Sequence, residues 1–494
     1  MKKILFLTLV CFLIAVGNAQ ATDTPTVSNV YQTAIVGCGV GGIKTLNSLA
    51  NAGQTNIICL EADPNRYGGR IDTFFVPGNP KAYERGASFF HDSNYNPTIA
   101  VATQQCGMTF QAMDFNSNSA WKDGRFLNVN QRTKIYMDYL NAWEGVDAYR
   151  QFGRSIADAI RLAGYDFDNR GVETLMMTDE QVIGDNLEFS SSVGVNSPPG
   201  DLGSDYIITS PGGYKQFLDC LLDTPISVRN KLQLGSRVTK VDLTTPSGKV
   251  TITYIQGGVT KTLIANKVEI AVPMGVLKAG TIQFVPALPA AYQGAIDRAL
   301  FGNVNKGFLF YSPTSAIAQK LTSLPVNIFY KIAVGDDPRY NDQLTYFYNN
   351  MFIQGQPVIQ SYYSGNYSRM TETMTDAQVL ALHTTALNFL VDSNNGGNNN
   401  NVNGQTPLPD PDIFIRTQWG KNPNIRGVYT DFGIYSTLAD FTIFGTPIQN
   451  KLFFAGEYVL IEDPNAPGTV TGSIGTVYNA YLSAELASQK ILGL

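Results

Sequence analysis

The chain has 494 residues, of which 44% are hydrophobic and 15% charged, and its formal net charge is −5. This length and hydrophobic content allow a large buried core divided over two or more domains. The mildly acidic balance excludes the basic surface expected of a nucleic-acid-binding protein. Only two histidines are present, His91 and His383, and no histidine or cysteine cluster has metal-ligand spacing, so we expect no metal site.

The first 21 residues have the pattern of a secretion signal. Lys2 and Lys3 precede an apolar run over residues 4–16, and small residues follow at 17–21. The sequence therefore predicts a signal peptide over residues 1–21 and a secreted protein, extracellular or periplasmic, with an uncleaved anchor as the alternative. Cleavage would remove both lysines and take the net charge from −5 to −7. No later stretch reaches the ~18 apolar residues of a membrane-spanning helix.

A glycine-rich turn at residues 37–42 is the first site motif. Residues 31–36 before it read as a short buried strand, and apolar residues at helical spacing follow it. Gly37 permits the tight turn, Gly39 lets the backbone approach a pyrophosphate, and Gly42 lets the helix and strand pack closely. The phosphates would then lie at the positive N-terminus of the helix. Taken alone, the turn indicates a dinucleotide, either NAD or FAD.

An acidic residue completes this motif. The second predicted strand, residues 56–60, leads directly into Glu61, which lies 19 residues after Gly42. That position matches the acid that binds a ribose hydroxyl in dinucleotide sites. The strand, helix and acid together indicate a functional dinucleotide site rather than a chance arrangement of glycines.

Four cysteines remain after the signal. Cys38 and Cys59 lie inside the dinucleotide unit, where small buried residues are expected, so we expect packed thiols rather than bridge partners. For Cys106 and Cys220 the sequence leaves a disulfide open. Asn366 begins one glycosylation sequon, whose use depends on a eukaryotic host.

Four motifs near the N-terminus resemble FAD-dependent amine oxidases, the family of monoamine, polyamine and L-amino-acid oxidases. They are Gly37-x-Gly39-x-x-Gly42, Glu61-Ala62, Gly68-Gly69-Arg70-Ile71 and Glu84-x-Gly86-Ala87. Residues 84–97 are most similar to the polyamine oxidases, in which an aromatic residue, a histidine and an Asn-Pro pair follow Gly-Ala. The resemblance covers the chain from about residue 30 to the C-terminus.

The resemblance implies an α/β fold with a Rossmann-like FAD-binding domain and a discontinuous α+β substrate-binding domain. The FAD-binding domain is expected over residues 28–97, 210–285 and 425–494, and the substrate-binding domain over 98–209 and 286–424. An Asn/Gly-rich tract near 392–405 cannot bury apolar area, and we expect a disordered surface loop there.

The same resemblance assigns cofactor contacts beyond the glycine turn and Glu61. They are Gly69, Arg70, Gly86, Ala87, Val238, Trp419, Glu457, Thr469 and Val470. The segment Gly468–Ser473 is expected to open the C-terminal helix, which places the amides of Thr469 and Val470 at the flavin pyrimidine edge. Residues 458–467 lack the cysteine that some family members bond to the flavin, so FAD is expected to be held non-covalently.

Lys306 is the main candidate for the chemistry. It lies in the apolar, strand-like run Gly302–Phe310, where burial would lower its pKa. In the family the matching lysine holds a water against flavin N5. His91 is the candidate for placing or deprotonating the amine, and Phe89 and Tyr429 are expected to contact the substrate.

The resemblance therefore implies a secreted oxidase that takes a hydride from a primary or secondary amine to flavin N5. Dioxygen would reoxidise the flavin to give hydrogen peroxide, and the imine would hydrolyse to a carbonyl compound. A slender polyamine is favoured, because Thr469 stands where many members have a second aromatic wall. The alternatives are an L-amino-acid oxidase, although Phe89 stands where those enzymes have arginine, and an FAD-binding protein without turnover. The expected partners are a small-molecule amine and O2, and the oligomeric state is left open.

Overall fold

The computed structural model describes residues 30–494 apart from 114–118, 123–124, 127–128, 166–181, 195–197, 199–200, 324–328, 334–345 and 393–408. The predicted signal peptide, residues 1–21, lies outside the described residues. So does the predicted disordered loop from residue 393 onward.

An eight-stranded sheet carries the dinucleotide motif, with strand order β10-β2-β1-β13-β12-β11-β14 and β22 paired to β13. Its strands are β1 (Tyr31–Val36), β2 (Ile57–Leu60), β10 (Leu232–Gln233), β11 (Ser236–Asp242), β12 (Val250–Gln256), β13 (Val259–Ile270), β14 (Gln283–Val285) and β22 (Leu452–Phe454). The pairs β10–β2, β2–β1, β1–β13 and β13–β22 are parallel, whereas β12 is antiparallel to both of its neighbours. The α/β fold class with a parallel Rossmann-like sheet is confirmed.

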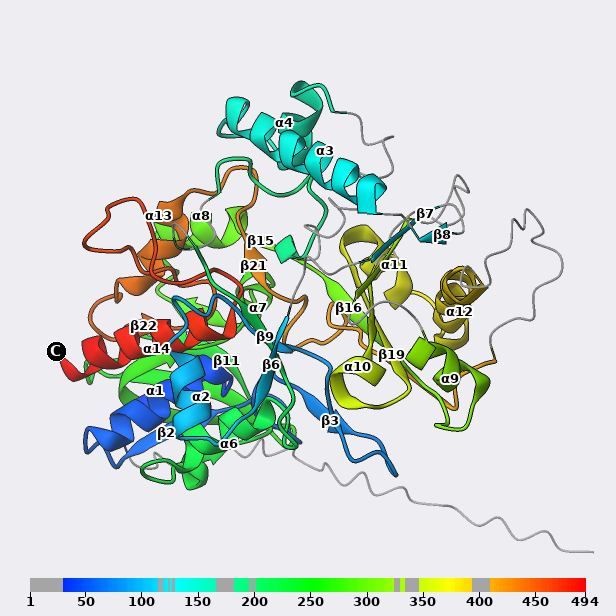
Figure 1. Ribbon diagram of the computed structural model, residues 1–494. Helices are drawn as coiled ribbons and strands as arrows, with labels where there is room; N and C mark the ends of the chain where they lie inside the picture. The colour runs from blue at the N-terminus through cyan, green and yellow to red at the C-terminus, as the bar shows by residue number, and fades with distance from the viewer. Residues whose placement is uncertain are drawn as a thin grey trace, which may run out of the picture.

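Both ends of the chain cover one face of this sheet. Helix α1 (Val40–Asn51) packs beside the C-terminal helix α14 (Val477–Leu492), and the two are joined by an ion pair between Lys44 Nζ and Glu485 Oε1 at 3.0 Å. Figure 1 shows them side by side in blue and red, with α6 (Lys215–Asp223) and α2 (Thr98–Gln104) nearby. The apolar face of α1 supplies Ile43, Leu46 and Leu49, each fully buried. The helical spacing seen in the sequence is therefore the face that packs on the sheet.

A seven-stranded sheet forms the other large layer, with order β20-β16-β19-β18-β17-β7-β8. Its strands are β7 (Ser119–Lys122), β8 (Arg125–Phe126), β16 (Val304–Phe310), β17 (Phe329–Ala333), β18 (Tyr346–Asn349), β19 (Val358–Ser364) and β20 (Ile413–Arg416). Every residue of β16, including Lys306, is buried. A charged residue in such a central strand is costly unless its head group finds partners.

Smaller elements connect the two sheets. The short strands are β3 (Thr73–Phe75), β4 (Ala82–Glu84), β5 (Phe89–Phe90), β6 (Phe110–Met113), β9 (Asp205–Ile208), β15 (Leu300–Phe301) and β21 (Thr430–Asp431). The remaining helices are α3 (Val129–Ala148), α4 (Ile156–Leu162), α7 (Met274–Lys278), α8 (Ala290–Arg298), α9 (Ala316–Ser323), α10 (Asn350–Gln354), α11 (Gly365–Glu372), α12 (Asp376–Asp392) and α13 (Leu438–Thr442), with 3-10 turns at Arg229–Lys231 and Ile443–Gly445. Among the described helices, none is both long and apolar enough to cross a membrane.

The chain passes repeatedly between the two sheets. Strands of the first sheet come from residues 31–60, 232–285 and 452–454, and those of the second from 119–126 and 304–416. The finer domain boundaries stay predictions. The first half of β13 pairs with β12 and its second half with β22, so this one strand joins two parts of the sheet.

Candidate active site

A cavity of about 1060 Å³ receives residues from both large sheets. Its size lies at the upper end of the ~300–1,000 Å³ typical of ligand sites. Fourteen of the predicted site residues line it: Gly37, Gly39, Glu61, Gly69, Arg70, Gly86, Ala87, Phe89, His91, Val238, Lys306, Trp419, Tyr429 and Glu457. The predicted site residues that do not line it are Gly42, Thr469 and Val470.

The glycine turn has the geometry predicted for it. Gly37 has φ +98°, in the region that favours glycine, and its amide donates to Leu60 O at 2.8 Å. Gly42 lies behind the turn, where an added Cβ would come within 2.0 Å of Gly37 O and 3.0 Å of Ile35 Cγ2. Gly39 differs, because a Cβ there would meet no protein atom closer than 3.9 Å. Gly42 therefore serves the packing of α1 on β1, and the open space at Gly39 faces the cavity.

Glu61 fixes the end of β2 against this turn. One carboxylate oxygen accepts from the Cys38 amide at 3.0 Å and the other from the Asp63 amide at 2.9 Å. The side chain is buried, and burial raises the pKa of Glu61 although the two amides counteract this. The acid thus lies at the rim of the turn, as a ribose-binding residue requires.

Cys38 and Cys59 form a disulfide, so the expectation of packed thiols is wrong. Parallel pairing places Cys59 of β2 opposite Ile35 of β1, and Cys38 follows shortly after in the turn. Their Cα atoms are 6.0 Å apart, within bridging distance. Spacing along the chain could not show this, because the two residues meet only through strand register. The pair left open, Cys106 and Cys220, is also bonded and links the end of α2 to α6.

The loop after Glu61 brings backbone and charge to the cavity. Gly68 and Gly69 have φ +103° and +57°, and the Gly68 amide donates to Cys38 O at 2.8 Å. Arg70 then donates to Val428 O and to Glu457 Oε1, both at 2.6 Å. Glu457 is buried and also accepts from the Thr430 hydroxyl at 3.0 Å. Arg70 and Glu457, 387 residues apart, therefore form one charge pair at the cavity wall.

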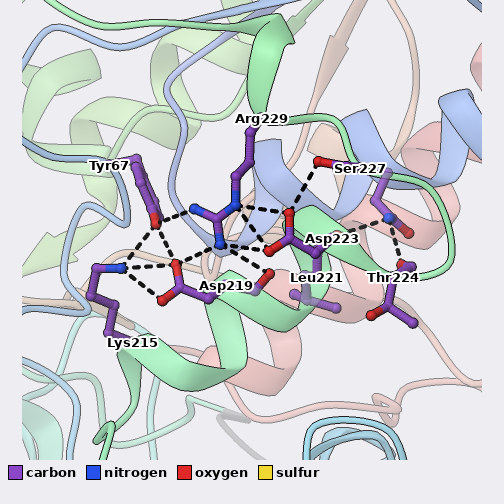
Figure 2. A network of polar contacts seen from close by, with 9 residues as sticks. Tyr67, Lys215, Asp219, Leu221, Asp223, Thr224, Ser227 and Arg229 are labelled. Atoms are coloured by element: carbon purple, nitrogen blue, oxygen red, sulfur yellow. Dashed lines mark hydrogen bonds and ion pairs between the residues drawn. The ribbon is translucent and has the colours of Figure 1, made fainter.

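A surface network holds this loop from outside. Figure 2 shows Tyr67 directed toward Lys215, Asp219 and Arg229 from α6 and the following turn. The Tyr67 hydroxyl donates to Asp219 and accepts from Lys215 Nζ and Arg229 Nη1, each at 3.0 Å. Lys215 and Arg229 are nearly half exposed, so water and salt weaken this network relative to the Arg70–Glu457 pair.

The C-terminal helix starts later than predicted. The tripeptide Gly-Thr-Val occurs at residues 468–470 and again at 475–477, and only the second copy opens the helix. Thr476 is the N-cap of α14, and Ser473 to Val477 line the cavity. Thr469 and Val470 lie in the preceding loop, where Val470 forms a bridge with Glu462. The predicted helix start is wrong, because identical residues seven positions apart look alike in sequence, and Thr469 and Val470 do not line the cavity.

Lys306 reaches the cavity from β16. Its Nζ donates to Glu84 O at 2.9 Å, to Gly86 O and to Ser88 Oγ at 2.6 Å, and it lies 4.6 Å from the centre of the Tyr362 ring. Burial lowers the pKa of Lys306, and the nearby Glu84 carboxylate offsets only part of this, so the predicted lowering is confirmed. The lysine joins β16 to the Gly86-Ala87 segment, and its proposed role toward a water stays a prediction.

His91 pairs with an acid that the sequence did not single out. Its Nδ1 lies 2.9 Å from Asp205 Oδ2, and the imidazole side chain is 40% exposed. Asp205 lines the same cavity from the start of β9. No local motif surrounds Asp205, and it becomes a site residue only through the pairing of β9 with β5.

Several aromatic side chains line the part of the cavity beside His91, where we expect the substrate to bind. The Phe89 ring lies 5.5 Å from His91 and 6.2 Å from Tyr348, which in turn lies 5.1 Å from Tyr362. Tyr348 and Tyr362 were also missed from sequence, because they follow no motif. Tyr429, predicted as the aromatic wall, lines the same cavity as these aromatic residues.

The comparisons with known proteins agree with this site. The family model described as flavin-containing amine oxidoreductase matches residues 40–181 and 173–492. The chain belongs to the flavin-containing amine oxidoreductase family. Its cofactor is accordingly FAD, which decides between the two dinucleotides that the glycine turn allowed.

Individual relatives of the chain are distant. Lysine-specific histone demethylase 1 homolog 2 of Arabidopsis thaliana is 23% identical over 93% of the chain and 58% of its own length. Polyamine oxidase 3 of Oryza sativa subsp. japonica is 25% identical over 94% of the chain and 90% of its own length. Probable polyamine oxidase 4 of Arabidopsis thaliana is 29% identical over 52% of the chain and 44% of its own length. The chain spans little more than half of the plant demethylase homologues that it matches.

The residues present fit FAD. Backbone atoms of Gly39 and Gly69 face each other at the cavity, since a Cβ on Gly69 would lie 3.7 Å from Gly39 Cα. The N-terminus of α1 begins at the same place, which favours a pyrophosphate. Glu61 would hold the ribose, and the N-terminus of α14 at Thr476 would face negative charge at the other end of the cofactor. FAD would thus be held by both ends of the chain.

Proposed function

We propose that this protein is a secreted, FAD-dependent oxidase of primary or secondary amines, with polyamine-like substrates favoured. The observation that carries the proposal is that a buried lysine, Lys306, lines the same cavity as the glycine turn. A lysine in a central strand is costly, and its carbonyl and hydroxyl partners place the ammonium at the junction of the two sheets. A protein that bound FAD only as a structural element would not need a buried lysine in this cavity.

The flavin supplies an acceptor for a hydride from the carbon beside the amine nitrogen, which no side chain can provide. The protein binds and orients the substrate. Phe89, Tyr348 and Tyr362 present apolar faces to a slender carbon chain, and His91 lies beside Phe89 to contact a nitrogen. Lys306 would hold a water where dioxygen reacts. The imine product would then hydrolyse to a carbonyl compound and release the second amine fragment.

Non-covalent binding of FAD follows from the cysteines. The four described cysteines form two disulfides, so none of them offers a thiol for a flavin bond. The cofactor should therefore leave the protein on acid or denaturant treatment, and the released material should have the mass of intact FAD.

Secretion is supported by the N-terminal pattern and by the same two disulfides, because such bonds persist mainly in oxidising compartments. Expression of the full chain in its host should give protein outside the cytoplasm that begins near residue 22. Recovery of the chain from the cytoplasm with Met1 retained would contradict secretion.

A substrate panel tests the activity. FAD-loaded protein without a histidine tag is incubated with spermine, spermidine, aromatic monoamines, L-amino acids and a peptide bearing an N-methylated lysine, and hydrogen peroxide is measured. We expect peroxide with spermine or spermidine. Peroxide formed only with L-amino acids would support the amino-acid oxidase alternative. Peroxide formed only with the peptide would support a demethylase activity, as in the names of several relatives. No peroxide from any substrate, with FAD intact, would overturn the oxidase proposal.

A further inference from the structure

Strand pairing places Asp205 beside His91. In the antiparallel pair β5–β9, Phe90 lies opposite Tyr206, so the next residues along, His91 and Asp205, face each other at the strand ends. One oxygen of Asp205 lies 2.9 Å from His91 Nδ1, and the other accepts from the Asp92 amide at 3.1 Å. One carboxylate therefore holds both the imidazole and the backbone directly after it.

Asp92 fixes this segment from the opposite direction. It has φ +57°, a left-handed conformation that non-glycine residues seldom adopt unless the surroundings enforce it. Its buried carboxylate accepts from the Tyr478 hydroxyl at 2.8 Å and from Ser473 Oγ. Tyr478 belongs to α14 and Ser473 lines the cavity, so the chain after His91 is tied to the cofactor side of the site. The strained backbone is thus held by contacts on two elements.

We propose that Asp205 is a positioning residue that holds His91 as an imidazolium, with Nδ1 engaged and Nε2 left for the cavity. A carboxylate at 2.9 Å makes a charge-assisted hydrogen bond with the protonated ring, and that bond is stronger than one to a neutral ring. The β5–β9 register sets the position of the Asp205 backbone, and the Asp92 amide holds its carboxylate, which therefore cannot turn away without losing that hydrogen bond.

The other titratable groups near this segment include one further carboxylate, one lysine whose head group is held by other partners, and two phenols. Asp92 adds a second carboxylate on the same segment. Lys306 from β16 donates hydrogen bonds from Nζ to Glu84 O, Gly86 O and Ser88 Oγ. The phenols of Tyr362 on β19 and Tyr478 on α14 stay neutral, because burial raises the pKa of each.

The balance of these effects raises the pKa of His91. Burial lowers it, but the hydrogen bond and charge of Asp205, with the charge of Asp92, raise it by more. In the reciprocal direction, burial raises the pKa of Asp205, but the hydrogen bond and charge of His91, together with the Asp92 amide, lower it by more. Both directions favour the ion pair over the neutral pair.

This inference rests on the proposed function for its consequence. An imidazolium donates a hydrogen bond from Nε2 but cannot take a proton from the substrate. His91 would therefore place a neutral nitrogen of the substrate rather than deprotonate an ammonium. A second positive charge on the substrate next to His91 would be disfavoured, which limits how a diamine can lie in the cavity.

The chain offers a direct test because it contains only two histidines. FAD-loaded protein without a histidine tag is labelled with 13C and 15N in the histidine rings, and both ring signals are followed by NMR from pH 4.5 to 9. His383 is the internal control, because burial lowers its pKa to about 4. We expect the His91 midpoint above the ordinary histidine value in the wild-type protein and at least one pH unit lower in Asp205→Asn, with Asp205→Glu close to wild type.

The His383 signal also reports folding, because its ring is fully buried between Ser361 and Val379. An unchanged His383 signal in Asp205→Asn shows that the variant is folded. A wild-type midpoint at or below about 6.5, the ordinary value for histidine, or an equal midpoint in folded Asp205→Asn, would overturn the inference. The titration needs no substrate, so its failure leaves the oxidase proposal standing, and an absence of turnover leaves the inference intact.

Discussion

The two sides of the cavity are built in different ways. On the cofactor side, the glycine turn and Glu61 lie within residues 37–61 and present mainly backbone. On the substrate side, Lys306, His91 and Asp205 are side chains from separate strands, and the contact from Lys306 to Glu84 O spans 222 residues. The glycine turn depends on the conformation of one short segment, whereas the substrate side depends on the register of several strands. Substitutions on the two sides should therefore have different effects on stability, FAD binding and reaction rate.

The largest effect is expected from Gly42→Ala. Its Cβ would come within 2.0 Å of Gly37 O, so the turn or the helix must move. We expect loss of FAD and a decrease of more than about 3 kcal/mol in the free energy of unfolding, since only a few mechanisms give so large a change.

Gly39→Ala is the matched variant, because its Cβ meets protein only at 3.9 Å. It should keep the stability of the FAD-free protein and lose cofactor affinity in a fluorescence titration. Wild-type FAD binding in Gly42→Ala, or an unfolded Gly39→Ala, would contradict the assigned roles.

On the substrate side, Lys306→Met should spare FAD binding and slow the chemistry. We expect reoxidation of the reduced flavin by oxygen to be slower by about 100-fold, in the range of a lost acid–base or charge effect. Stopped-flow absorbance after anaerobic reduction measures this rate, and a cofactor titration measures binding in the same sample. Equal reoxidation rates in the two proteins would remove the role proposed for Lys306.

Glu269 gives a prediction for the sheet beneath the cofactor side. It lies in β13 between Ile35 and Phe453 and is fully buried, with the Thr45 hydroxyl as a polar neighbour of its carboxylate. Burial raises the pKa of Glu269 to about 8. Between its unfolded pKa and this value the folded protein keeps a proton that the unfolded chain has lost. Glu269 therefore stabilises the fold less as pH rises through this range.

Glu269→Gln should remove that dependence. Relative to wild type, its free energy of unfolding should improve by about 4 kcal/mol between pH 5 and pH 8.5, since about three pKa units lie in this range and each corresponds to about 1.4 kcal/mol. Urea unfolding at both pH values measures the difference. Parallel pH curves for the two proteins would show that Glu269 does not hold the proton.

The smallest effect is expected from Tyr67→Phe. The variant keeps the ring and removes the hydroxyl that contacts Asp219, Lys215 and Arg229 in Figure 2. Because the charged members are partly exposed, we expect less than about 1 kcal/mol of stability and less than a three-fold change in FAD affinity. A ten-fold loss of affinity would mean that the cofactor side depends on distant side chains as well as on its local backbone.

The comparison also explains what could be predicted from sequence. Residues 31–36 were predicted as a strand with the same bounds as β1, because the buried run, turn and helix are all local signals. The roles of Gly37 and Gly42 followed from the same segment. The burial of Lys306 could be predicted from the apolar residues around it.

The sequence-based predictions missed pairs of residues that lie close together in the fold but whose spacing along the chain does not show it. The disulfide between Cys38 and Cys59 depends on the register of β1 and β2, and the Asp205–His91 pair on that of β5 and β9. The helix start was misplaced at Thr469 because a repeated tripeptide offered two equal positions. Strand pairing, rather than residue type, carried the missing information.

Anaerobic mixing of FAD-loaded protein with spermine or spermidine, followed by air, tests the central claim most directly. We predict that the flavin absorbance bleaches on mixing and returns with oxygen, with one hydrogen peroxide formed per flavin reoxidised. An absorbance that stays unchanged with these polyamines and with every other amine of the panel, in protein that still holds FAD, would contradict the assignment of amine oxidation to this site.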